Sequence, residues 1–179
     1  MPRLSSRVRN RARKIKLLLL DLDGVLTDGG IFIDGSGDEV KRFDVRDGHG
    51  LRLLQRGGIR VGIVSGRSAR AARHRARELD IELFFQGVGD KLAVYEKIKR
   101  MTKLTDGEVA YVGDDMVDLP LLSRVGLAVG VADGWGPLKS HTHYITRARG
   151  GRGAVREVVE LLLKSQGKWQ ELTKKYQRS

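Results

Sequence analysis

The sequence predicts an α/β fold with a central parallel sheet and one projecting β-hairpin. Residues 17–20 form an unbroken apolar run that ends in Asp21 and Asp23, a pattern typical of a strand buried on both faces. After this strand, short apolar segments alternate with helical segments, as in the right-handed βαβ units that build a parallel sheet. An Asp-Gly turn signal lies between apolar stretches at about residues 31–45 and predicts the hairpin.

Each element of this fold has a local signal of its own. The first strand is expected over residues 15–22, and the hairpin that follows interrupts the α/β alternation and therefore projects from the sheet. Asp47 is expected to cap the next helix, which Gly57-Gly58 ends. Further strands are expected over residues 59–64, 81–85, 109–112, 127–131 and 144–146, with helical segments over residues 68–79, 90–100, 115–124, 137–140 and 153–166.

The chain of 179 residues is expected to form one domain with a basic segment at each end. We expect a flexible basic arm over residues 1–14, a single domain over residues 15–168 and a basic C-terminal tail over residues 169–179. Of the formal net charge of +12, the first 16 residues carry +7 and the last 19 carry +4. Because the charge is concentrated in the terminal segments, we interpret these segments as solvent-exposed tails. A nucleic-acid-binding protein would instead carry the charge on one surface of its folded domain.

Composition excludes several classes of protein. The sequence has no cysteine, which excludes a disulfide framework, a thiolate nucleophile and a cysteine-based zinc site. The apolar run at residues 17–20 is too short to span a bilayer, and no small-residue cleavage site of a signal peptide follows it. We therefore expect a cytoplasmic protein that binds neither a membrane nor a specific nucleic acid.

Asp21 and Asp23 are the first candidates for a functional site. Side chains alternate along a strand, so both carboxylates are expected to leave it on the same face. Two like charges that lie close together are costly unless a cation or a proton is shared between them. Mg²⁺ takes oxygen ligands and keeps room for a phosphate group. A Mg²⁺ site is therefore expected at the carboxyl end of this strand, where open α/β sheets bind their ligands.

Other strand ends carry groups suited to phosphate and metal. Ser65-Gly66-Arg67 follows one expected strand, and Gly113-Asp114-Asp115 follows another, with Asp118 one helical turn later. Lys91 begins a helix between them, where its ammonium can face a phosphate. In a doubly wound sheet these points open onto one crevice. Carboxylates, a hydroxyl, a basic residue and helix N-termini in that crevice predict a phosphate site.

These segments resemble, in order, the four motifs of the haloacid dehalogenase (HAD) superfamily: Asp21-Leu22-Asp23-Gly24-Val25-Leu26-Thr27, Val64-Ser65-Gly66-Arg67, Lys91 and Gly113-Asp114-Asp115-Met116-Val117-Asp118. Flanking segments at residues 43–50, 86–91 and 150–157 resemble the capless HAD phosphatases of 3-deoxy-D-manno-octulosonate 8-phosphate. The resemblance covers roughly residues 15–168. It implies a HAD-like Rossmannoid three-layer sandwich.

The resemblance also implies a role for each acidic candidate. Asp21 matches the family nucleophile, which forms an aspartyl-phosphate. Asp23 matches the acid that protonates the leaving alcohol and then the base that activates water. Mg²⁺ would be held by the Asp21 carboxylate, the Asp23 main-chain carbonyl and Asp114. Asp115 and Asp118 would either bind the ion or support its ligands, and the sequence leaves open which of them is the better metal partner.

The remaining candidates are assigned to the phosphate and the sugar. The residues implied at the transferring phosphoryl group are Ser65 and Lys91, with Gly24 and Gly66 beside them. Arg67 could pair with the carboxylate of a sugar acid, since a guanidinium suits bidentate carboxylate binding. Arg152 is a second candidate substrate contact.

The activity implied by the resemblance is Mg²⁺-dependent hydrolysis of 3-deoxy-D-manno-octulosonate 8-phosphate, in the lipopolysaccharide precursor pathway of a Gram-negative bacterium. The resemblance also implies a homotetramer, in which the projecting hairpins join in a central barrel and a neighbouring subunit closes each site. A nine-carbon sialic-acid-type sugar phosphate remains open as the substrate. So does a non-catalytic HAD-like scaffold that binds a partner through its basic arms, although Asp21 and Asp23 argue against it.

Overall fold

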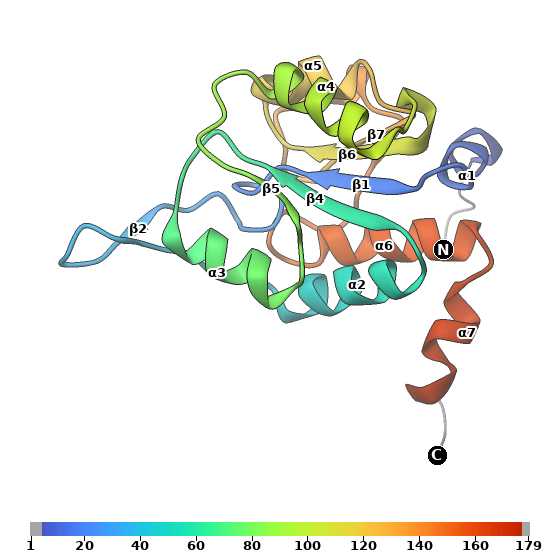
Figure 1. Cartoon of the computed structure of the whole chain (residues 1–179), viewed down its shortest axis with the longest axis horizontal. Coiled ribbons are helices and arrows are strands. Elements are labelled where there is room, and N and C mark those ends of the chain that lie inside the picture. The colour runs from blue at the N-terminus through green and yellow to red at the C-terminus, as the bar shows by residue number, and fades with distance from the viewer. Residues whose placement is uncertain (1–4, 177–179) are drawn as a thin grey trace.

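The computed structural model describes residues 5–176 and has a six-stranded parallel sheet at its centre (Figure 1). The strand order is β5-β4-β1-β6-β7-β8, so the chain winds outward from β1 in both directions. The strands are β1 Leu17–Leu20, β4 Arg60–Val64, β5 Leu83–Phe85, β6 Val109–Gly113, β7 Leu127–Gly130 and β8 Tyr144–Ile145. The predicted parallel sheet is therefore confirmed. Because parallel strands end at the same edge, the residues that follow β1, β4 and β6 come together there.

Helices cover both faces of this sheet, with α4 and α5 on one face and α2, α3 and α6 on the other (Figure 1). The α-helices are α1 Ser6–Ala12, α2 Val45–Arg56, α3 Arg70–Glu78, α4 Lys91–Thr102, α5 Leu119–Leu122, α6 Ala154–Ser165 and α7 Trp169–Thr173. Short 3₁₀ turns lie at Asp106–Glu108, Met116–Asp118, Gly136–His141 and Lys174–Tyr176. None of the helices between residues 5 and 176 combines the length and the apolar character needed to cross a membrane.

The apolar run of β1 is buried because the strand faces helices on both sides. Leu18 and Leu20 belong to the core cluster that includes residues of α2 and α6, whereas Leu17 and Leu19 belong to the cluster that includes residues of α4 and α5. All four side chains are fully buried. Alternation of side chains along a strand thus explains why this run has no polar residue.

The projecting hairpin is confirmed, with shorter strands than its predicted span of residues 31–45. Its strands are β2 Phe32–Ile33 and β3 Glu39–Val40, which pair antiparallel and lie apart from the central sheet. Figure 1 shows the hairpin extending from the end of the molecule opposite α7. Apolar side chains on it are exposed, including Phe32 at 57 % and Ile33 at 67 %. A two-stranded hairpin of this kind is marginal by itself in water.

Residues 5–14 contain the docked helix α1, Ser6–Ala12, instead of the predicted flexible arm. The Ser5 hydroxyl caps α1 by accepting a hydrogen bond from the Val8 N–H at 3.2 Å. Val8 and Ala12, four residues apart, are both buried, so the helix has one face in the core. The Arg11 guanidinium also donates to the Gly126 carbonyl at 2.6 Å. Residues 1–4 of the expected arm lie outside the described residues.

The expected basic tail over residues 169–179 is helical in its described part. The side chains of Trp169 and Leu172 pack against the main core cluster. The Trp169 ring lies 5.3 Å from the Arg156 guanidinium and 5.0 Å from the Lys164 ammonium, which both favour an aromatic face. Residues 177–179 lie outside the described residues.

Two local predictions were wrong. Asp44, and not Asp47, caps α2, because its carboxylate accepts the Arg46 N–H at 2.7 Å. Asp47 is buried one turn later and points to a different helix. The single helix expected over residues 115–124 is a 3₁₀ turn followed by the one-turn helix α5, because the Asp118 carboxylate accepts backbone N–H groups from the preceding residues and tightens the turn.

Candidate active site

A cavity of about 520 Å³ opens at the carboxyl edge of the sheet, where β1, β4 and β6 end. Eight residues that the sequence predicted for the site line it: Asp21, Asp23, Ser65, Gly66, Arg67, Lys91, Asp114 and Asp115. β1 ends at Leu20, so strand alternation does not place Asp21 and Asp23 as the sequence predicted. They lie in the turn after the strand, and both still face the cavity.

Three carboxylates come together at this cavity, two in its lining and one fully buried beside them. Asp21, Asp114 and Asp118 each offer one oxygen, and these oxygens all lie within 4.8 Å of one another. Burial, together with repulsion from Asp118, raises the pKa of Asp21 to about 6. Burial and repulsion from Asp21 and Asp118 raise the pKa of Asp114 to about 8. A cluster of buried oxygen donors that repel one another is a suitable site for a hard divalent cation such as Mg²⁺.

Asp118 holds the other groups of the site in place. It is fully buried, and its Oδ1 accepts hydrogen bonds from Lys91 Nζ at 2.7 Å and from the Tyr111 hydroxyl at 2.5 Å. Its Oδ2 accepts the N–H groups of Asp114 and Asp115 at 2.8 and 3.2 Å. These four interactions occupy the acceptor positions of the carboxylate. Asp118 is therefore placed to orient its neighbours more than to bind an ion.

Lys91 places a buried ammonium in the site. It begins α4, and the Asp90 carboxylate fixes that start by accepting the N–H groups of Leu92 and Ala93. The Lys91 ammonium lies 3.0 Å from Asp21 Oδ2 and is buried. Burial alone would lower the pKa of Lys91, but attraction to Asp21 and Asp118 raises it above its ordinary value. Lys91 therefore stays charged next to Asp21, where it can attract a phosphate.

Asp23 has a partner that the sequence did not reveal. Its Oδ1 accepts a hydrogen bond from Lys41 Nζ at 2.6 Å. Its Oδ2 is buried and has no hydrogen-bond partner within residues 5–176. Lys41 lies at the base of the hairpin. A lysine at such a position is expected to be exposed to solvent, so the sequence does not indicate that it binds Asp23.

Ser65, Arg67 and Asp115 take their positions from local contacts. The buried Ser65 hydroxyl donates to the Arg67 carbonyl at 3.1 Å, which fixes the turn after β4. The Arg67 guanidinium forms an ion pair with Glu39 of the hairpin. The Asp115 carboxylate accepts the Met116 N–H at 2.7 Å and stands outside the three-carboxylate cluster.

Three predicted residues lie outside the cavity lining: Gly24, Asp118 and Arg152. Of these, Arg152 lies on the surface. Its guanidinium is 3.6 Å from Asp28, and its side chain is 56 % exposed. Two glycines precede Arg152 because the backbone there lies very close to another loop. A Cβ at Gly150 would lie 1.8 Å from the Gly24 carbonyl oxygen, and the Gly151 N–H donates to the Val25 carbonyl at 2.9 Å. This loop therefore rests directly on the turn that carries Asp21 and Asp23.

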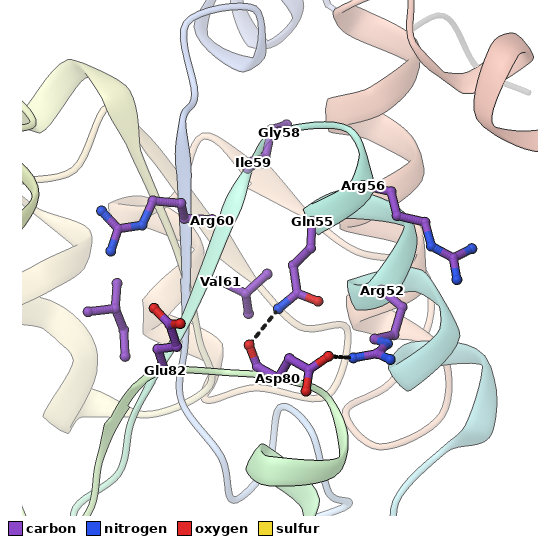
Figure 2. Close-up of a pocket in the computed structure, with 10 residues that line it drawn as sticks. Arg52, Gln55, Arg56, Gly58, Ile59, Arg60, Val61, Asp80 and Glu82 are labelled. Carbon is purple, nitrogen blue, oxygen red and sulfur yellow. Dashed lines mark hydrogen bonds and ion pairs between the residues drawn. The ribbon is translucent and has the colours of Figure 1, made fainter.

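A second cavity, of about 530 Å³, lies at the opposite edge of the sheet (Figure 2). It is located where β4 and β5 begin, and Arg52, Arg60 and Asp80 are among its lining residues. Figure 2 shows the Arg52 guanidinium paired with Asp80, whose carbonyl also accepts the Gln55 amide at 3.1 Å. None of the predicted site residues lines it, so the cavity at the carboxyl edge is the candidate site.

Comparison with known proteins decides the family. The model of the haloacid dehalogenase-like hydrolase family matches residues 44–126. The chain is 45% identical to the 3-deoxy-D-manno-octulosonate 8-phosphate phosphatase KdsC of Yersinia pestis, over 91% of this chain and 87% of the relative. The chain belongs to this family of phosphatases, within the haloacid dehalogenase-like hydrolases. The predicted recognition, the fold class and the prediction of a phosphomonoesterase are confirmed.

Solved structures agree with this membership. The crystal structure of the Moraxella catarrhalis 3-deoxy-D-manno-octulosonate 8-phosphate phosphatase, in complex with a magnesium ion, a phosphate ion and a KDO molecule, is 37% identical and superposes with a TM-score of 0.94 over 97% of this chain and 100% of that one. A probable YrbI family phosphatase of Pseudomonas syringae pv. phaseolica is 42% identical, with a TM-score of 0.95 over 98% and 99%.

Proposed function

We propose that this chain is a Mg²⁺-dependent phosphatase that hydrolyses 3-deoxy-D-manno-octulosonate 8-phosphate to the free sugar acid and phosphate, in lipopolysaccharide precursor synthesis. The observation that carries the proposal is the meeting of Asp21, Asp114 and Lys91 in one cavity with Ser65. These groups supply two oxygen donors for a cation, a nucleophile, and donors for phosphoryl oxygens. Phosphoryl transfer depends on this kind of positioning and charge stabilisation.

Asp21 and Asp114 would hold the Mg²⁺ ion through their carboxylates, with the main-chain carbonyl of Asp23. The buried oxygens of the cluster fit a hard cation because their mutual repulsion falls when positive charge lies between them. The ion, when bound, neutralises charge on the phosphoryl oxygens. Asp118 would orient Lys91 and the Asp114 backbone, and Asp115 would cap its turn without binding the ion.

Asp21 would attack phosphorus and carry the phosphoryl group as an aspartyl-phosphate. Lys91 and the Ser65 hydroxyl would hold the phosphoryl oxygens, next to the backbone of Gly24 and Gly66. Asp23 would give a proton to the leaving alcohol and then take one from the attacking water. The free Oδ2 atom of Asp23 suits this role, because it is the oxygen that no protein group occupies within the described residues.

Two arginines would select the sugar acid. Arg67 lines the cavity, and its guanidinium already binds one carboxylate, that of Glu39. A substrate carboxylate could share or replace that partner. Arg152 lies beside Asp28 and is more than half exposed, so it would reach substrate only when another surface closes the site.

The exposed hairpin supports our proposal of a homotetramer. Phe32, Ile33 and Val40 are exposed on a two-stranded hairpin that needs partners, and further copies of this chain would cover them in a homotetramer. A neighbouring copy would then close the cavity. We also propose that residues 15–168 are the catalytic domain and that the enzyme works in the cytoplasm.

Phosphate release from a panel of sugar phosphates, with Mg²⁺ and then with EDTA, tests the proposal. Hydrolysis confined to the octulosonate 8-phosphate and lost in EDTA is expected. Turnover of nine-carbon acid phosphates instead would keep the chemistry and change the substrate. Asp21→Asn should abolish turnover with the fold intact, and residual activity above a few per cent would count against Asp21 as nucleophile. Absence of turnover with every substrate would favour a non-catalytic scaffold.

A further inference from the structure

The Asp23 carboxylate is held on one side and open on the other. Its Oδ1 accepts the Lys41 ammonium at 2.6 Å, and the Thr27 hydroxyl lies 3.4 Å from the same oxygen. Its Oδ2 is buried without a hydrogen-bond partner among residues 5–176. A buried polar atom of this kind marks a place where a further group binds. Since Asp23 lines the cavity, that group would be substrate or water.

The side chain of Lys41 is covered, although the residue lies at the base of an exposed hairpin. Its side chain is 1 % exposed, and its ammonium lies 3.0 Å from Glu39 Oε2 in addition to Asp23. A lysine is almost never so buried unless it is paired, and removing one partner of such a pair leaves a costly unpaired charge. The two carboxylates therefore fix the ammonium at one position.

Glu39 connects this pair to Arg67, another residue that lines the cavity. One of its oxygens faces Lys41, and the other forms an ion pair with Arg67. Arg67 lines the cavity together with Asp23. Charges of alternating sign thus run from Asp23 through the hairpin base to the turn after β4.

We propose that Lys41 is a positioning residue for proton transfer at Asp23: by occupying Oδ1 it fixes the orientation of the carboxylate and leaves Oδ2 as the oxygen that exchanges protons in the reaction. The inference rests on the proposed phosphatase function. In the first step the bond from phosphorus to the leaving oxygen breaks, the bond from Asp21 to phosphorus forms, and the Oδ2 proton moves to the leaving oxygen. In the second, Oδ2 takes a proton from the water that attacks phosphorus, and the Asp21–phosphorus bond breaks.

The test compares two leaving groups in the Lys41→Met variant, which keeps the length of the side chain and removes its charge. One substrate is the sugar phosphate, whose alkoxide needs a proton to depart. The other is 2,4-dinitrophenyl phosphate, whose leaving group departs without one. General acid catalysis contributes about 10²–10⁴-fold. We expect kcat/KM to fall about 10–100-fold for the sugar phosphate and less than about 3-fold for the dinitrophenyl ester.

The ratio of the two kcat/KM values is the decisive number, because it does not depend on the fraction of folded enzyme. An unchanged ratio, whether both values fall equally or neither falls, overturns the proposal and leaves Lys41 a structural role. Lys41→Gln gives the same measurement if the methionine variant does not fold. Arg70→Met is the control: it removes the exposed ion pair between α3 and Asp38 of the hairpin, touches nothing at Asp23, and should leave the ratio unchanged. Wild-type enzyme that hydrolyses neither ester would instead refute the phosphatase function itself.

Discussion

Gly24 and Asp114 approach each other so closely that no side chain fits between them. A Cβ built on Gly24 would lie 2.0 Å from Asp114 Oδ2 and 2.5 Å from its Cγ. Gly24 also has a φ of +86°, which residues with a Cβ rarely adopt. The turn after β1 therefore forms one wall against which the Asp114 carboxylate is placed, close to Asp21.

Gly24→Ala should remove activity while leaving the protein folded. The new methyl group displaces the Asp114 carboxylate from the cluster, so we expect kcat to fall at least about 100-fold, with a stability loss of about 1–2 kcal/mol from the positive φ. Gly58→Ala is the matched control, because Gly58 has a φ of +78° and nothing lies within 4 Å of its Cβ position. Kinetics and urea unfolding of both variants check this. Equal activity losses would show that backbone strain, and not the Asp114 contact, is responsible.

Asp114→Asn should make the free energy of unfolding almost independent of Mg²⁺. The wild-type protein is expected to gain about 2.7 kcal/mol at a Mg²⁺ concentration 100 times the Kd, because the ion binds only the folded state. The variant loses a carboxylate from the cluster and should gain almost nothing, although its EDTA-treated form should be at least as stable as wild type because a repelling charge has gone. Thermal unfolding with Mg²⁺ or EDTA measures both effects.

Asp115→Asn separates the two acidic neighbours. Asp115 caps Met116 and lies outside the cluster, so its variant should keep the Mg²⁺-dependent gain in thermal stability. Loss of that gain on changing Asp115, with Asp114→Asn unaffected, would reverse the assignment of the ligand.

The sequence predicted that these candidate residues lie in one cavity because they follow apolar strands. Asp21, Ser65 and Asp114 each come directly after a strand that a local apolar pattern reveals, and a parallel sheet brings such positions to one edge. Lys91 followed from the same alternation of strands and helices. The geometry between these residues is thus encoded in the order of the elements.

Residues whose partners come from distant segments were not predictable in this way. The sequence predicts a lysine exposed to solvent at position 41. Its side chain is covered only because the base of the hairpin folds against Asp23. The sequence predicts that Asp47 caps its own helix. In the structure its hydrogen-bond partners are more than 100 residues away in the sequence. Residues 5–14 read as an arm because their many arginines obscure the apolar pair Val8 and Ala12. In each case long-range packing, and not local pattern, decides the outcome.

Phe32→Asp should reduce the oligomeric state. The side chain is 57 % exposed on the hairpin, and a charge there would have to be buried if copies of the chain pair through this surface. We expect a smaller species in size-exclusion chromatography with light scattering, with sugar-phosphate hydrolysis reduced about 10-fold or more because the cavity loses its cover. Met101→Asp is the control, since Met101 is 58 % exposed on α4. A fully active monomer would contradict the proposal that copies share the site.

Asp47 fastens α2 to the start of α6, and this contact should be visible in the pH dependence of stability. Its carboxylate oxygens accept the Gly153 N–H at 3.2 Å and the Arg156 N–H at 2.6 Å, and the side chain is 1 % exposed. Burial raises its pKa from 3.8 to about 6. Asp47→Ala leaves both N–H groups without their partner and should cost about 2–3 kcal/mol.

Because the folded state holds the Asp47 proton more tightly than the unfolded state, its ionisation destabilises the protein as pH rises from about 4 to about 6. Asp47→Asn cannot ionise, so the stability of this variant relative to wild type should increase over that window, by up to about 3 kcal/mol. Asp44→Asn should change the pH dependence of stability in the opposite direction. Hydrogen bonding to Arg46 lowers the pKa of Asp44, so its contribution to stability is present above the unfolded pKa and is lost as pH falls below about 4. Urea unfolding in EDTA between about pH 2.5 and about pH 7.5, a range that extends below the unfolded pKa of Asp44 and above the raised pKa of Asp47, measures the two slopes. Parallel curves for wild type and Asp47→Asn would contradict the raised pKa of Asp47.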